Sequence, residues 1–101
     1  MRCIVTTVHD PVALAVTCQR LGLPPPTEGT IQLDAEEVSG WIVRLPGVRH
    51  PIVCNILTGL VAYHSVDNAH DRIARIARFV LRYYDVRHQL SRAGLPARRS
   101  A

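Results

Sequence analysis

Apolar and polar residues alternate in five short stretches of the chain and recur at helical spacing in two longer ones. Residues 3–9 are rich in β-branched side chains, which is typical of a strand. Turn residues separate the later apolar stretches, with polar residues 36–40 predicted as one turn and Pro46-Gly47 as another. The pattern therefore predicts further strands at residues 30–34, 41–45, 51–57 and 60–66.

Two helices are predicted from their end signals. Asp10 can cap a helix N-terminus and Pro11 fits the first helical position. This first helix ends at Gly22, because the prolines at 24–26 prevent its continuation. The second helix runs from about residue 68 to residue 93, a stretch that contains neither proline nor glycine.

The predicted order of elements is β-α-β-β-β-β-α, which indicates an α+β fold. Short connections make the strands an antiparallel sheet, and the long C-terminal helix packs on one of its faces. Residues 1–96 form a single domain, and residues 97–101 are expected to be a basic disordered tail. The core is expected to join residues of the helix and the sheet, namely Ile73, Ile76, Val80 and Tyr84 with Ile52, Cys54, Ile56 and Val61.

A two-residue loop at Thr58-Gly59 would join the last two strands and place Cys54 opposite Tyr63. Successive side chains in a strand point to opposite faces, so Cys54 and His64 would point apart. This argues against a cysteine–histidine nucleophilic pair. Asn55 and His64 would share a face, where they are candidates for a ligand contact.

Charge is divided unevenly along the chain. The twelve basic residues are all arginines, and the formal net charge is +4. Four arginines and six acidic residues up to position 70 give −2, and eight arginines and two acidic residues after it give +6. Such a basic helix either meets an anionic partner or is simply the solvated side of an amphipathic helix. The candidate residues for binding an anionic partner are Arg72, Arg75, Arg78 and Arg82.

The sequence lacks the residues that several classes of function require. The cysteines at 3, 18 and 54 have neither the spacing of a metal site nor that of a redox motif, so free thiols in a cytoplasmic protein are expected. The sequence has no glycine-rich phosphate loop and no coherent catalytic set. We therefore expect no metal, no cofactor and no membrane span, and the chain is more typical of a binding protein than of an enzyme.

Short motifs in residues 1–64 resemble a known family. They are DPVAL at 10–14, CQRLGLP at 18–24, GT at 29–30, VRLPG at 43–47, PIVC at 51–54 and TGLVAY at 58–63. The resemblance is to small uncharacterised bacterial proteins, common in planctomycetes, that form a domain of unknown function. That domain is distantly similar to hypothetical chloroplast reading frame thirty-five. The resemblance to the bacterial family implies a partner role for this protein, with an AAA-type ATPase as one candidate partner, and it supplies no catalytic residue.

The sequence leaves three functional hypotheses. The first is a non-enzymatic protein-interaction module, with a homodimer among the alternatives. The second is a nucleic-acid-binding module that uses the arginine face of the C-terminal helix. The third is a small ligand binder that uses Asn55 and His64.

Overall fold

The computed structural model describes residues 1–92, and the predicted helix end at 93 and tail at 97–101 lie outside this part. None of the helices within residues 1–92 is long and apolar enough to cross a membrane. The elements are β1 (Arg2–Val5), α1 (Pro11–Arg20), β2 (Thr27–Leu33), β3 (Glu36–Val43), β4 (Ile52–Asn55), β5 (Leu60–Tyr63), a short 3-10 helix (Ser65–Asp67) and α2 (His70–Arg92).

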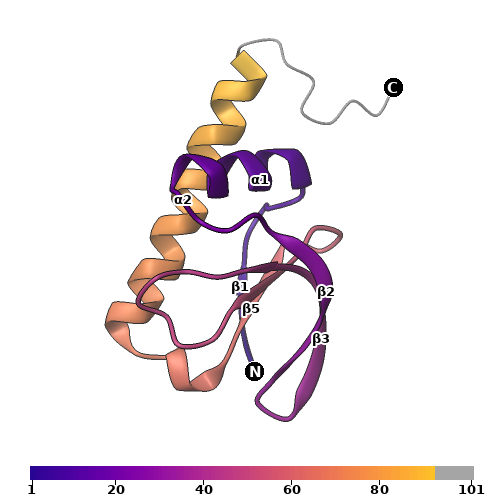
Figure 1. Cartoon of the computed structure of the whole chain (residues 1–101), viewed down its shortest axis with the longest axis vertical. Helices are drawn as coiled ribbons and strands as arrows, with labels where there is room; N and C mark the ends of the chain where they lie inside the picture. The colour runs from indigo at the N-terminus through magenta and orange to yellow at the C-terminus, as the bar shows by residue number, and fades with distance from the viewer. Residues whose placement is uncertain (93–101) are drawn as a thin grey trace.

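The strands form one sheet in the order β1-β5-β4-β3-β2, and all neighbouring strands are antiparallel. Both helices lie along one side of this sheet, while the β2–β3 hairpin curls away on the other side (Figure 1). The predicted α+β fold, with an antiparallel sheet and a long C-terminal helix, is confirmed.

The N-terminus of α1 forms as the sequence predicts. Asp10 is the N-cap, and its Oδ1 accepts hydrogen bonds from the backbone N–H of Val12 at 3.0 Å and of Ala13 at 3.3 Å. At the other end Gly22 adopts a φ of 70°, a conformation that favours glycine after a helix. Local residue chemistry thus sets both ends of this helix.

The turn between β2 and β3 differs from the prediction. Residues 36–40 form the first part of β3, and the chain reverses at Asp34-Ala35. Asp34 takes a φ of 59°, which aspartate tolerates better than most residues. The mostly polar residues 36–40 indicated a turn, but they form the start of a strand that lies between β2 and β4, where Glu36, Glu37 and Ser39 are exposed.

The β4–β5 loop is also longer than predicted. Residues 56–59 form a four-residue turn, so Cys54 pairs with Val61 and not with Tyr63. Asn55 closes this turn, because its Oδ1 accepts from the N–H of Leu57 at 3.0 Å and of Thr58 at 3.3 Å. The register shifts by two residues, so the predicted faces of the two strands are unchanged.

The main core lies between the helices and the sheet. Ile76 and Val80 are buried there with Ile52, Cys54 and Val61, as predicted. The rest of the predicted core is less buried: Ile73 and Tyr84 are only half-buried, and Ile56 lies in the β4–β5 turn.

The buried face of α2 is wider than the predicted stripe. Phe79, Tyr83 and Val86 are buried in the same core. They are buried because α1 packs beside α2 and brings Leu14 and Cys18 into the cluster, so α2 faces both a helix and a sheet.

A second, smaller cluster lies on the other face of the sheet. Leu33, Val53 and Ala62 are buried there, with Ile31, Val38 and Ile42 packed around them. Asp34, in the turn of the β2–β3 hairpin, attaches the hairpin to the short 3-10 helix, because its carboxylate accepts hydrogen bonds from Ser65. These bonds, with the nearby amino terminus, hold the pKa of Asp34 well below its ordinary value.

Candidate functional site

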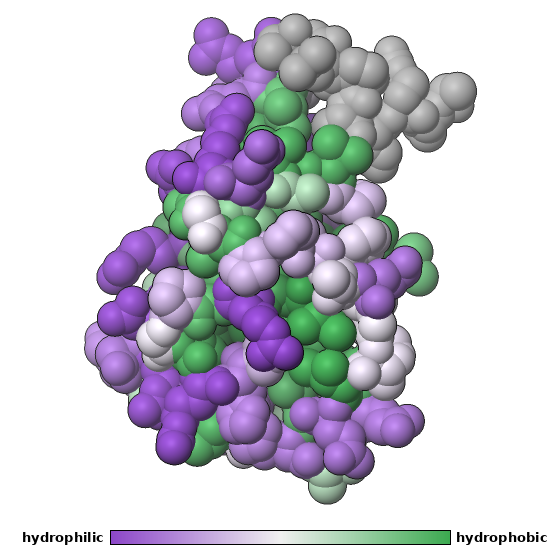
Figure 2. Space-filling model, viewed as in Figure 1, coloured by the Kyte–Doolittle hydropathy of each residue, from purple (hydrophilic) through white to green (hydrophobic). Residues whose placement is uncertain are grey.

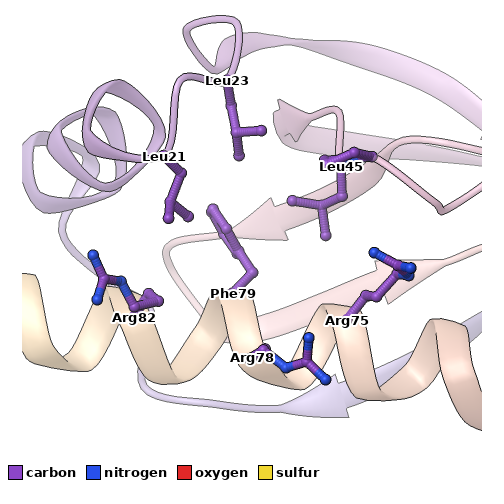
Figure 3. A pocket seen from close by; sticks show the side chains of 8 residues that line it. Leu21, Leu23, Leu45, Arg75, Arg78, Phe79 and Arg82 are labelled. Carbon is purple, nitrogen blue, oxygen red and sulfur yellow. The ribbon is translucent and has the colours of Figure 1, made fainter.

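A hollow of about 210 Å³ opens beside the middle of α2. Leu21, Leu23, Leu45 and Phe79 point toward one another in it, and arginines stand along the α2 side (Figure 3). A space-filling view shows apolar green atoms exposed on one face of the molecule, with polar purple side chains among and around them (Figure 2). We name Arg75, Arg78 and Arg82 the pocket arginines, and the hollow that they border the arginine pocket.

Two connections bring leucines to the arginine pocket. Leu21 and Leu23 follow α1, where the N–H of Leu23 bonds the carbonyl of Cys18 at 2.9 Å and turns the chain. Leu45 lies in the β3–β4 connection, just before Pro46. The side of the pocket opposite α2 is therefore apolar.

Gly47 fits closely against one pocket arginine. It adopts a φ of 80°, and a Cβ built on it would lie 2.6 Å from Nε of Arg75. The exposed Arg75 side chain can move aside, so it is the positive φ that favours glycine at this turn.

The arginines of α2 differ in their partners. Within residues 1–92, the pocket arginines make no ion pair or hydrogen bond through their side chains, and all three are exposed. Arg72, predicted with them, instead has its Nε 3.8 Å from Oδ1 of the buried Asp67 and donates to the carbonyl of Val66. The predicted set of four thus separates into three unpaired arginines and one paired arginine.

The structure does not bring Asn55 and His64 together. Asn55 closes the β4–β5 turn, whereas His64 follows the opposite end of β5. Nδ1 of His64 accepts from the N–H of Val66 at 3.0 Å, and its ring stacks on His50 at 4.1 Å. Asn55 and His64 therefore make separate local contacts, and Asn55 also lines a hollow of about 440 Å³ beside Trp41.

A second hollow, of about 420 Å³, lies near the start of α1. Its central hydroxyl, on Tyr83, accepts hydrogen bonds from the N–H of Asp10 at 3.0 Å and of His9 at 3.3 Å. Oδ2 of Asp10 lies 3.4 Å from Nε of Arg87. These contacts connect the segment before α1 to α2.

The buried thiols have no chemical partner. Burial raises the pKa of Cys18 to about 11 and the pKa of Cys54 to about 12, so both thiols stay protonated at neutral pH. All three cysteines are free, and residues 1–92 contain no group of three side chains that could hold a metal ion. The cysteines therefore give no support to a reactive site.

No family model, curated protein or solved structure matches the chain. The resemblance to the bacterial family and its plastid counterpart stays a prediction, as does an AAA-type ATPase partner.

The arginine pocket combines two kinds of recognition. Guanidinium groups bind carboxylates or phosphates through charge-assisted hydrogen bonds. The leucines beside them offer apolar surface to a side chain that leaves water. The arrangement suits a partner that is both acidic and partly apolar. The sequence indicated the arginines by their spacing, but the leucines come from two distant connections and had no common signal.

Proposed function

We propose that this protein is a protein-interaction module that binds an acidic partner through the arginine pocket. Three exposed arginines border an apolar hollow and, within residues 1–92, none of them has a carboxylate within ion-pair distance; this observation carries the proposal. Exposed guanidinium groups without a partner form charge-assisted hydrogen bonds with carboxylates that a binding partner brings. An acidic protein surface supplies such groups.

The composition of the pocket favours protein over nucleic acid. Proteins that bind single strands stack bases on exposed aromatic rings. Among the described lining residues the one aromatic ring is Phe79, which is only 3% exposed, and the remaining apolar side chains are leucines and a proline. Nucleic-acid binding through phosphate contacts alone is therefore the alternative outcome of the test.

The test compares two variants with the same loss of charge. The pocket variant carries R75Q, R78Q and R82Q. The control variant replaces three exposed arginines outside the pocket, and carries R2Q, R44Q and R49Q. Binding of poly-L-glutamate and of a duplex DNA fragment is measured by fluorescence anisotropy over a range of salt concentrations.

We expect the pocket variant to bind poly-L-glutamate about tenfold more weakly, and the control variant to bind it like the parent. Equal losses in both variants would mean that net charge acts without a site, and the proposal would fall. Preferential binding of DNA by the parent, with a steep dependence on salt that the pocket variant loses, would establish the nucleic-acid alternative instead.

A further inference from the structure

The two sides of the arginine pocket differ in chemistry. The α2 side carries the three guanidinium groups, and the opposite side consists of Leu21, Leu23, Leu45 and Pro46, with Phe79 between them (Figure 3). A partner with charge alone would satisfy the arginines and leave the leucines in water. A partner that fills both sides of the pocket therefore needs apolar as well as acidic groups.

The size of the hollow limits what can fill it. Small-molecule and cofactor sites have volumes of about 300–1,000 Å³. The arginine pocket, at about 210 Å³, lies below this range and is open to solvent. One or two apolar side chains of a polypeptide suit this space better than a cofactor does.

The spacing of the arginines sets the length of the contact. Arg75 and Arg82 are seven residues apart on α2, which corresponds to about 10 Å along the helix axis. Carboxylates that pair with all three arginines must therefore spread along a similar length of the partner. A short segment that lies alongside α2 meets this condition.

We infer that the partner presents a short acidic segment in which one aliphatic or aromatic side chain enters the hollow and flanking carboxylates pair with Arg75, Arg78 and Arg82. The inference rests on the proposed function and adds the apolar anchor to it. The leucine side of the pocket provides affinity for the anchor, and the arginine side fixes the position of the segment. Such an anchored segment is a common form of peptide recognition.

The anchor is tested with two synthetic peptides of equal charge. One is rich in glutamate with a single central leucine, and the other has alanine in place of that leucine. We expect the parent protein to bind the leucine peptide about tenfold more tightly, because a buried leucine side chain removes apolar surface from water. The pocket variant should lose most of its affinity for both peptides.

A second pair of variants locates the anchor. Leu21→Gln changes the apolar side of the pocket, and Leu57→Gln changes an exposed leucine outside it. Leu21 is 39% exposed and Leu57 is 88% exposed, so both variants should fold, which circular dichroism can verify. Only the Leu21 variant should reduce the preference of the protein for the leucine peptide.

The outcomes separate the anchor from the proposed function. If the parent binds both peptides equally and the pocket variant binds neither, the anchor is refuted and acidic-partner binding stands. If the parent binds neither peptide nor poly-L-glutamate, both proposals are refuted. If Leu21→Gln and Leu57→Gln have equal effects, the anchor does not enter this hollow.

Discussion

Arginines in the middle of α2 have different neighbours from arginines nearer its two ends. Arg72 and Arg87 each lie near a buried carboxylate, whereas the pocket arginines between them face leucines. The carboxylates come from the segments that precede the two helices, because Asp10 caps α1 and Asp67 lies in the 3-10 helix before α2. Residue type therefore does not decide the role of an arginine on this helix; the neighbouring segment does.

The difference matters because the two groups have different consequences for stability and binding. An ion pair with a buried carboxylate compensates a charge that has left water, so its loss destabilises the fold. An exposed, unpaired arginine contributes little to stability and stays available to a partner. Variants of the two groups therefore separate a loss of stability from a loss of binding.

The largest effect on stability is expected for a substitution on the buried apolar face of α2. Ile76 is fully buried in the core, although Arg75 and Arg78 beside it in the sequence are exposed. Ile76→Ala should lower the free energy of unfolding by about 2–5 kcal/mol, because it leaves a cavity in the core. Urea denaturation measures this loss. The matched change Leu81→Ala, on the same helix but 61% exposed, should lower it by less than about 1 kcal/mol. Equal losses would mean that the buried face of α2 is misplaced.

The elements of this fold were predictable where the signal is local. Asp10 and Pro11 mark the start of α1 in the sequence itself, and the same residues form the cap in the structure. The β2–β3 turn was misplaced because Glu36 and Glu37 look like turn residues in sequence. Their position on a strand depends on the conformation of Asp34 and on pairing with β2.

The site was predictable only in part, for a related reason. The helical spacing of Arg75, Arg78 and Arg82 follows from sequence, and so does their position on one side of α2. The separation of Arg72 from them depends on where Asp67 lies after folding. The leucine side of the pocket forms where two loops pack next to α2, and no periodic pattern in the sequence predicts that contact.

Removing the buried carboxylate of Asp10 should have the next largest effect on stability. Asp10→Ala removes both the N-cap of α1 and the ion-pair partner of Arg87. We expect the free energy of unfolding to fall by about 2 kcal/mol, as measured by urea denaturation. Asp85→Ala, at an exposed position of α2, is the control and should change it little. A similar loss in both variants would show that Asp10 has no special structural role.

At alkaline pH the buried thiols of the core can lose their protons, whereas arginine stays charged. A change in stability in this range therefore reports on the core and not on the ion pairs of arginine. The pKa values of Cys18 and Cys54, about 11 and about 12 in the folded protein, lie above those of unfolded thiols. Their stabilisation is thus complete below about pH 8.5 and is lost as the pH rises toward the folded values. The free energy of unfolding should fall by at most about 1.4 kcal/mol per pH unit for each thiol.

The control for this slope is a set of cysteine variants. Cys54→Ala should make the fall in stability between pH 9 and pH 10 shallower, whereas Cys3→Ala, at an exposed position, should leave it unchanged. Burial also raises the pKa of Tyr83, which adds to the loss only at higher pH. An identical slope in the parent and in Cys54→Ala would contradict the assignment to the buried thiol.

The smallest effect on stability should come from the pocket arginines themselves. The pocket variant removes three exposed charges that have no partner within residues 1–92, and glutamine has nearly the same helix propensity as arginine. We expect the free energy of unfolding to change by less than about 1 kcal/mol, with a midpoint of thermal unfolding close to that of the parent. The control variant should behave in the same way. A marked loss of stability in the pocket variant alone would place these arginines in a structural network. Its loss of binding would then reflect unfolding, and the contrast between paired and pocket arginines would no longer hold.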